Sequence, residues 1–191
     1  MIRLCDVVEV VSGTPQFRIT EESGSTAPTY AFYAQADLEE DLVGSHSADS
    51  TRKWIRTSDA VMTTSVGDVV FSLISGSSAI VGPGHEGCLL TQNYAKLVPS
   101  GEVEARYLVY LLNEDRGIRR QLRIGQQGSI SKKYALGQLA ALELPSLPSL
   151  ERQALIGELY VDQLRLDSLR KRVSELETTL VLEAIREVSQ S

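Results

Sequence analysis

The amino-acid sequence predicts an α+β protein, with a mixed β-sheet domain followed by one long C-terminal coiled-coil helix. Three observations support this fold class. Short apolar runs separated by Gly, Pro and Ser clusters fill the first hundred residues, a pattern typical of strands joined by turns. Helical spacing of apolar residues begins near residue 104. From residue 150 to residue 188 there is no proline and a single glycine, so no strong breaker interrupts a helix there.

The N-terminal third predicts two strands and a loop. Residues 2–11 form either a strand or a short amphipathic opening, which ends at the turn cluster Ser12-Gly13-Thr14-Pro15. Polar residues 18–29 predict an exposed loop, and residues 30–34 predict a second strand. The acidic run that follows, residues 37–41, lacks metal-ligand spacing and is expected to be solvated surface.

The middle of the chain predicts a hairpin and then a helix. Residues 69–74 are β-branched and aromatic, Ser75-Gly76-Ser77-Ser78 forms the turn, and residues 79–81 begin the return strand. Residues 88–90 and 94–99 are expected to add strand edges on either side of Thr91-Gln92-Asn93. The apolar spacing over residues 104–113 predicts a helix that can continue toward Leu122.

The C-terminal helix carries an apolar seam. Steps of three and four residues connect the seam positions Leu166, Leu169, Val173, Leu176 and Leu180. About forty residues at 1.5 Å each make a rod of roughly 60 Å. A stripe this long and narrow favours a partner helix, although a helix folded back on the domain is the alternative. We expect two units, a domain over residues 1–148 and a spacer and dimerisation helix over residues 149–191.

Composition and charge limit the class of protein. The chain has 42% hydrophobic residues and a net charge of −6, which argues against a protein that binds DNA through bulk positive charge. It has neither an apolar run of membrane-spanning length nor a signal-peptide pattern, so we expect a cytoplasmic protein that is not embedded in a membrane. Cys5 and Cys88 are expected to be buried, reduced thiols. Positive charge is local, because residues 116–133 contain six bases and no acid.

No catalytic motif is apparent in the sequence. There is no phosphate-binding glycine loop with Lys, no methyltransferase-type glycine loop with Asn-Pro-Pro, no nuclease pattern and no nucleophile elbow. His85 and Cys88 have a spacing that could ligate zinc, but no third or fourth ligand is evident. We therefore expect neither enzymatic activity nor a metal or cofactor.

An ordered series of short motifs resembles the DNA-specificity (S) subunits of type I restriction–modification systems. The series covers nearly the whole chain and comprises residues 4–15, Gly67 to Ser72 with Ser75-Gly76, Thr91-Gln92-Asn93, residues 107–112, Gly128-Ser129, and the proline hinge with helix entry at residues 144–153. The family often has a lysine soon after the Ser-Gly turn, and its absence here weighs against a phosphate contact at that turn. An ordinary S subunit has two recognition domains and two spacer helices, so this chain, with one of each, looks like a half-subunit.

The resemblance implies double-stranded DNA as the ligand. The residues expected to contact the DNA backbone are basic: Arg52, Lys53, Arg56, Arg116, Arg119, Arg120, Arg123, Lys132 and Lys133. The residues expected to read base edges are polar: Gln92, Asn93, Gln126, Gln127 and Ser129. Ordinary solvated charge is the alternative for the arginines, and a structural role in turns is the alternative for Gln92 and Asn93.

The resemblance also implies protein partners. A homodimer formed through the seam would read a symmetric, bipartite DNA site and recruit a methyltransferase (M) subunit, with or without a restriction (R) subunit. Half-sites one turn of DNA apart lie about 34 Å from centre to centre, and the helices could pair parallel or antiparallel. Two other classes remain open, a coiled-coil scaffold without DNA binding and a small enzyme of unfamiliar type.

Overall fold

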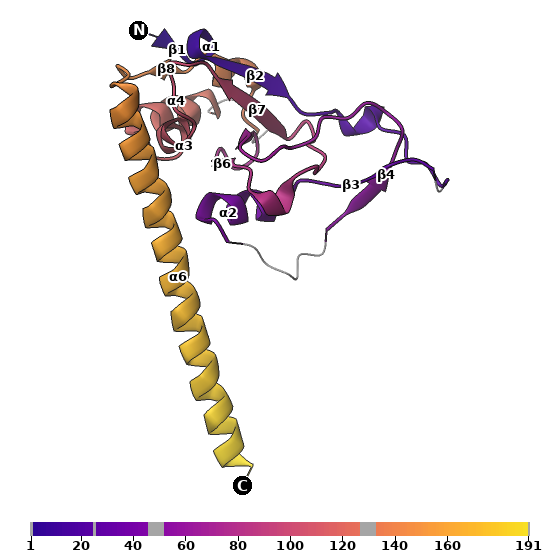
Figure 1. The fold of residues 1–191 in the computed structure, drawn as a ribbon, viewed down its shortest axis with the longest axis vertical. Coiled ribbons are helices and arrows are strands. Elements are labelled where there is room, and N and C mark those ends of the chain that lie inside the picture. Colours follow the sequence, from indigo (N-terminus) through magenta and orange to yellow (C-terminus); the bar gives the residue numbers. More distant parts are fainter. Residues whose placement is uncertain (1, 25, 46–51, 127–132, 191) are drawn as a thin grey trace.

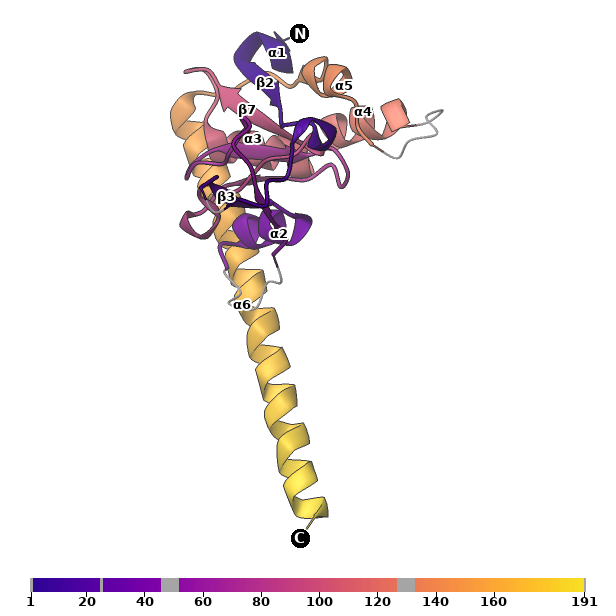
Figure 2. The same ribbon diagram turned by 90° about the vertical axis from the view of Figure 1, so that its right-hand side faces the viewer.

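The computed structural model describes residues 2–24, 26–45, 52–126 and 133–190, and it shows a head and a stalk (Figures 1 and 2). The head comprises the described residues up to 148. The stalk is a single uninterrupted helix, α6 (Leu150–Ser189), that starts at the head and extends well beyond it. This confirms the predicted α+β class and the long C-terminal helix.

A four-stranded antiparallel sheet in the order β2-β7-β5-β6 forms the centre of the head. Its strands are β2 (Val8–Ser12), β5 (Val69–Ser72), β6 (Ser78–Ile80) and β7 (Tyr94–Pro99). The predicted hairpin is confirmed, since Val69 pairs with Ile80 and Phe71 with Ser78. All four residues of β5 are buried because both faces of this strand are covered.

Two small antiparallel pairs lie beside the central sheet. The first joins β1 (Ile2–Arg3) to β8 (Glu143–Leu144), and the second joins β3 (Thr29–Ala31) to β4 (Trp54–Arg56). A single helical turn, α1 (Leu4–Val7), separates β1 from β2 and buries Leu4 and Val7. Cys5, on the outer side of this turn, is exposed, so the expectation of a buried thiol is wrong for Cys5 and right for Cys88. Residues 2–12 are therefore two strands with a turn of helix between them, which combines the strand and the short amphipathic opening that the sequence leaves as alternatives.

Helices cover the two faces of the sheet. On one face, Val69 and Phe71 pack in a core cluster with α3 (Ala105–Glu114), α4 (Arg116–Gln126) and α5 (Leu136–Ala140). On the other, Val70 and Ala79 pack with Tyr33 and with α2 (Gln35–Val43). Two short 3-10 turns complete the head, η1 (Gln16–Arg18) and η2 (Pro83–His85). The alternation of β5 side chains between these clusters follows the period of two in a strand.

The helix predicted from residue 104 is interrupted at Asp115. Asp115 has an extended backbone and accepts a hydrogen bond from the N–H of Ile118 (2.9 Å) on its side chain, so it caps a second helix. The sequence correctly predicts helix on both sides of this break. The capping role of Asp115 explains why α3 and α4 are separate helices.

The base of α6 is fixed to α3 by polar and steric contacts. The side chain of Gln153, which is buried, accepts a hydrogen bond from the N–H of Glu104 (2.9 Å) and donates to the carbonyls of Glu102 (3.0 Å) and Pro148 (2.9 Å). One turn later, a Cβ at Gly157 would lie 2.6 Å from the backbone nitrogen of Tyr107, so only glycine fits there. The stalk therefore leaves the head in one fixed direction.

The expectation that the acidic run at residues 37–41 is solvated surface is wrong for Asp37 and Asp41. Asp37 and Asp41 lie on the inward face of α2, where the side chain of Asp41 is fully buried. Asp41 accepts hydrogen bonds from the Tyr33 hydroxyl (2.8 Å) and the Gly82 N–H (2.9 Å), and it contacts His85 Nδ1 at 2.7 Å. Burial and the nearby Asp41 carboxylate raise the pKa of Tyr33, which keeps this hydroxyl protonated as a donor.

This buried cluster predicts a large stability effect at Asp41. Replacing Asp41 with Ala removes the acceptor that three buried or half-buried groups share, and unpaired buried polar groups are costly. We expect Asp41→Ala to lower the free energy of unfolding by about 3 kcal/mol, measured by urea denaturation. Glu39→Ala, an exposed acid on the same helix, is the matched control and should change it by less than about 0.5 kcal/mol. Equal effects from the two variants would contradict this role for Asp41.

Candidate functional site

Three of the four predicted arginines form an exposed row on α4. Ile118 and Leu122 face the core, whereas Arg116, Arg120 and Arg123 lie on the outer face of the helix. Helical geometry places residues three, four and seven apart on one side of a helix. We call these three side chains the α4 arginine row. Their positive charges are available to an anionic partner such as a phosphate backbone.

Arg119 differs from the other three arginines because it is half-buried. Its Nη1 donates hydrogen bonds to the carbonyls of Gly76, in the turn after β5, and of Leu112, near the end of α3. These contacts tie α4 to the hairpin turn. Arg119 is therefore a structural anchor for the helix that carries the row.

Asn93 and Lys133 lie side by side on the loops next to this turn. Lys133 Nζ donates to the Asn93 side-chain oxygen (2.6 Å). The backbone carbonyl of Asn93 accepts a hydrogen bond from the N–H of Leu73, and the N–H of Tyr134, the residue after Lys133, donates to the carbonyl of Leu73. Gln92 is exposed, and its backbone N–H donates to the carbonyl of Thr14 (2.9 Å). The structure thus gathers Asn93, Lys133 and Arg119 around residues 73–77, with Gln92 adjacent in sequence.

The second predicted basic cluster divides into different roles. Arg52 contacts the carboxylate of Asp37 (3.6 Å) and the carbonyl of Gly84 (3.4 Å), so it belongs with the buried cluster of α2. Lys53 lies over the ring of Phe32, with Nζ 5.3 Å from the centroid. Arg56 donates to Thr29 Oγ1 (3.3 Å) and the carbonyl of Gly24 (3.2 Å). Lys53 and Arg56 remain candidates for contacting an anion.

Several predicted residues lie outside what the structure describes. Gln127, Ser129 and Lys132 fall within residues 127–132, which are not described, and only the backbone of Gln126 is placed, at the end of α4. Trp54, which is 57% exposed on β4, is a candidate that the sequence motifs do not single out. The sequence does contain one signal for it, because the chain's single tryptophan lies between the basic residues Lys53 and Arg56.

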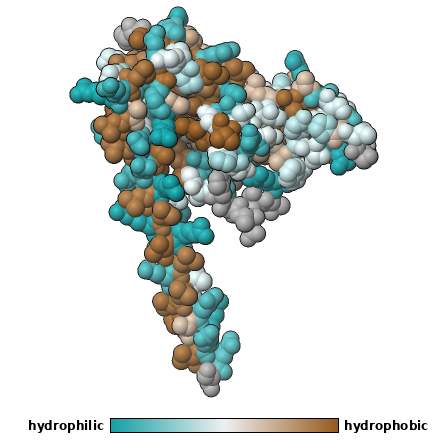
Figure 3. Space-filling view, in the orientation of Figure 1, coloured by the Kyte–Doolittle hydropathy of each residue, from teal (hydrophilic) through white to brown (hydrophobic). Residues whose placement is uncertain are grey.

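The predicted seam is exposed along the stalk. Leu166, Leu169, Val173, Leu176 and Leu180 are each 42–65% exposed, and the seam continues toward the head through Leu155 and Leu159. These residues lie on the side of α6 opposite Gln153, Gly157 and Tyr160, which face the head. Figure 3 shows apolar side chains following the stalk below the head. The helix is thus not folded back on the head along its length, and the seam faces away from it.

The last two turns of α6, which we call the tip, are apolar on a second face. This face comprises Val181, Leu182, Ile185 and Val188, each 49–78% exposed. It continues the side of the helix that packs on the head at the base. At the tip, therefore, apolar side chains surround much of the helix.

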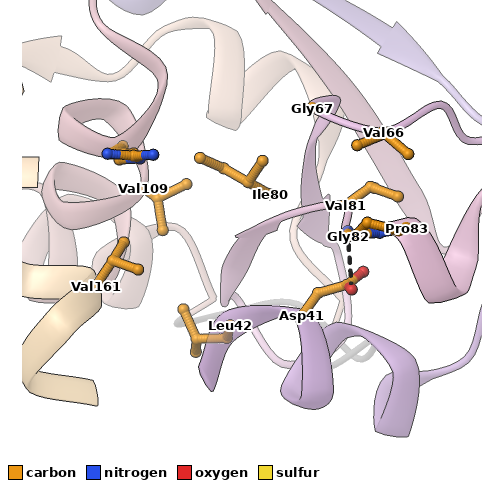
Figure 4. Close-up of a pocket in the computed structure, with 11 residues that line it drawn as sticks. Asp41, Leu42, Val66, Gly67, Ile80, Val81, Gly82, Pro83, Val109 and Val161 are labelled. Carbon is orange, nitrogen blue, oxygen red and sulfur yellow. Dashed lines mark hydrogen bonds between the residues drawn. The ribbon is translucent and has the colours of Figure 1, made fainter. Parts of the chain in front are cut away.

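A cavity of about 250 Å³ lies between the hairpin, α2, α3 and α6 (Figure 4). Aliphatic side chains, among them Ile80, Val109 and Val161, form most of its wall. Asp41 is the acid at its edge, and the hydrogen bond from Gly82 and the buried contacts described above already occupy its oxygens. The cavity is a packing gap without a titratable group placed for catalysis.

Two further properties follow from the described part of the chain. In residues 2–24, 26–45, 52–126 and 133–190, no three His, Cys, Asp or Glu side chains are arranged to hold a metal ion. Of the helices within these same ranges, none has the length and apolar character needed to cross a membrane.

Comparison with known proteins assigns the fold. No family model and no curated protein matches the sequence. Among solved structures, the HsdS subunit from Thermoanaerobacter tengcongensis is 21% identical with a TM-score of 0.54, covering 93% of this chain and 38% of that one. A chain from a study of complex assembly and conformational transition of the type I R-M system is 22% identical with a TM-score of 0.59, covering 96% and 42%.

A third solved structure supports the same fold. The type I restriction–modification S subunit from M. genitalium is 14% identical with a TM-score of 0.53, covering 93% of this chain and 42% of that one. This chain thus spans about two-fifths of the length of each of these proteins. The likeness confirms the fold that the motif series implies, at half size.

The two kinds of arginine on α4 predict effects of different size on substitution. Arg119→Ala removes a charged hydrogen-bond donor from two backbone carbonyls and should lower the free energy of unfolding by about 2 kcal/mol. Arg120→Ala removes an exposed charge and should change it by less than about 0.5 kcal/mol. Thermal or urea unfolding of both variants measures the difference. A stable Arg119→Ala protein would contradict the anchoring role.

Proposed function

We propose that this chain is a non-catalytic DNA-recognition subunit of a type I restriction–modification system that works as a homodimer. The observation that carries the proposal is a single head held on a rigid stalk whose apolar seam is exposed. Solved S subunits have the same fold, and this chain spans about two-fifths of their length. Two copies would supply two heads and two stalks.

The α4 arginine row is the surface that we assign to the DNA backbone. Its three guanidinium groups are exposed on one helix face, and the anchor at Arg119 holds that helix against the hairpin turn. The net charge of −6 does not prevent such binding, because charges more than about 10 Å away are largely screened at 0.1 M salt. A coiled-coil scaffold without DNA binding is the competing function, which the exposed seam alone would also allow.

The seam is the surface that we assign to the second copy. An apolar stripe of this length on a stalk that projects into solvent costs free energy until another helix covers it. The seam residues face away from the head, so a partner helix can approach without displacing the head.

Charge along α6 favours antiparallel over parallel pairing. Residues 163–172 contain four bases and one acid, a net charge of +3, whereas residues 173–189 contain four acids and one base, a net charge of −3. In a parallel pair, each segment would lie beside its like-charged copy. In an antiparallel pair that crosses near residue 172, the basic segment lies beside residues 172–181 of the partner, which include Glu175 and Glu177. Like charges facing each other destabilise helix pairs, whereas opposite charges stabilise them.

Antiparallel pairing also sets the distance between heads. The head contacts α6 around residue 158, and in such a dimer the partner's head would be level with residue 186. Twenty-eight residues at 1.5 Å each separate the two heads by about 42 Å along the stalk. This is somewhat more than one turn of B-DNA, roughly 34 Å. The resulting target is two identical, inverted half-sites separated by a spacer that is not read.

The second apolar face of the tip is the surface that we assign to the methyltransferase subunit. Its four residues are exposed, and they lie outside the seam that the second copy covers. Catalysis would then reside in that subunit, and in a restriction subunit where one is present.

DNA binding should depend on salt through the α4 arginine row. Each phosphate contact contributes a slope of about −0.9 to log affinity against log salt. We expect the triple variant Arg116→Ala, Arg120→Ala, Arg123→Ala to reduce the steepness of the slope by about 2 to 3. Fluorescence anisotropy of a labelled duplex, with the chain alone and with the methyltransferase subunit, measures it.

A charge-matched control keeps this experiment interpretable. The variant Arg106→Ala, Arg152→Ala, Arg186→Ala removes three exposed arginines outside the row and should leave the slope unchanged. Equal losses in the two triple variants would exclude a specific role for the row. Absence of any salt-dependent binding, with or without the methyltransferase subunit, would favour the scaffold.

Cysteine cross-linking tests the direction of pairing. In a Cys5→Ser background, Leu180→Cys should not form a disulfide with itself, because an antiparallel pair separates the two tips. A mixture of Leu166→Cys and Leu180→Cys chains should form a mixed disulfide, read by non-reducing electrophoresis. Efficient self-linkage of Leu180→Cys would instead indicate parallel helices. The buried Cys88 is not expected to interfere.

A further inference from the structure

Trp54 stands out from the rest of the head because a large aromatic side chain lies in solvent on a well-held strand. It is the chain's single tryptophan, and 57% of its surface is exposed. A tryptophan is among the largest apolar groups a protein can bury, and it is enriched where a surface binds a partner. The position therefore calls for a binding role.

The strand that carries Trp54 is fixed on both sides. The carbonyl of Lys53 accepts a hydrogen bond from the Phe32 N–H (2.9 Å), and the carbonyl of Arg56 accepts one from the Glu22 N–H (2.9 Å). Thr57, directly after the strand, is fully buried. The indole is thus presented from a fixed backbone, so its exposure does not result from a frayed end.

Positive charge accompanies the indole. Side chains two apart in a strand lie on one face, so Arg56 shares the face of Trp54. Arg56 donates to two neutral oxygens, those of Thr29 and Gly24, and Lys53 lies over the Phe32 ring. Among the described residues, neither Lys53 nor Arg56 forms an ion pair with a carboxylate. The positive charges of both side chains can therefore attract an anionic partner.

The location of β4 separates this surface from the dimer contacts. Figure 1 shows β3 and β4 on the side of the head away from α6. A second copy bound at the seam would therefore leave Trp54 uncovered. An exposed aromatic ring flanked in sequence by two cations matches the chemistry of nucleic acid, in which apolar bases and sugars alternate with phosphates.

We propose that Trp54 contacts a base or deoxyribose of the bound DNA while Arg56 and Lys53 contact the flanking phosphates. This inference rests on the proposed function and adds to it a contact that is separate from the α4 arginine row. The indole supplies apolar contact area, and the two cations set its register on the backbone.

Intrinsic fluorescence tests the proposal directly, because Trp54 is the sole tryptophan. The full chain, alone and with its methyltransferase subunit, is titrated with a 40-base-pair duplex at low salt. We expect the emission of Trp54 to change and its quenching by acrylamide to fall at least about threefold on DNA binding. The methyltransferase subunit should carry phenylalanine in place of its own tryptophans, so that the signal comes from Trp54 alone.

Variants separate the apolar contact from the ionic one. Trp54→Ala should weaken DNA binding about tenfold without changing the salt slope, which is the effect expected for one lost base–aromatic contact. Trp54→Phe should restore most of the affinity. Arg56→Ala should reduce the steepness of the slope by about one. Circular dichroism confirms that each variant is folded.

Each remaining outcome decides against the proposal in a different way. One outcome would overturn this contact and leave the proposed function standing. In it, the chain binds DNA in a salt-dependent way, but Trp54 emission and acrylamide quenching do not change and Trp54→Ala keeps full affinity. A change caused by the methyltransferase subunit without DNA, lost in Trp54→Ala, would show that this surface binds protein. Absence of DNA binding in every mixture would overturn both the contact and the proposed function.

Discussion

The contact between the base of α6 and α3 is the constraint on which the rest of the molecule depends. The buried amide of Gln153 satisfies the backbone at the start of α3, and Gly157 lets the two helices approach closely. Farther along, the Tyr160 hydroxyl donates to Glu114 (3.1 Å) and its ring packs edge-on against Tyr110. A helix held at three successive turns cannot swivel, so the head and the stalk act as one rigid piece.

Rigidity at this joint gives the exposed seam its functional meaning. If the joint were loose, a paired stalk would bring two heads together without fixing the distance between them. With the joint fixed, pairing of the stalks in the proposed dimer would determine where both heads lie relative to a DNA duplex. The heads would then need only to read short sequences, because the stalks would set the spacing. The α4 arginine row and the Trp54 strand lie on the head, where such a reading surface is needed.

Much of the fold could be predicted from local pattern, and the failures have physical reasons. The β5–β6 hairpin and α6 were predictable because strand alternation, turn residues and the heptad are local signals. The burial of Asp41 was not, because it depends on His85, which is 44 residues away in sequence. Likewise, Arg119 looks like its neighbours in the sequence, and only the fold brings the Gly76 carbonyl to it. Trp54 could have been singled out by composition, but its exposure depends on tertiary structure.

The central claim is that the stalk requires a second copy of this chain. Sedimentation equilibrium of the full chain over a wide range of concentration tests it most directly. The account predicts a species of twice the chain mass of 20.9 kDa, converted to monomer when Leu169 and Val173 are both replaced by Glu. A wild-type chain that remains monomeric at tens of micromolar, with its seam exposed to solvent, would contradict it.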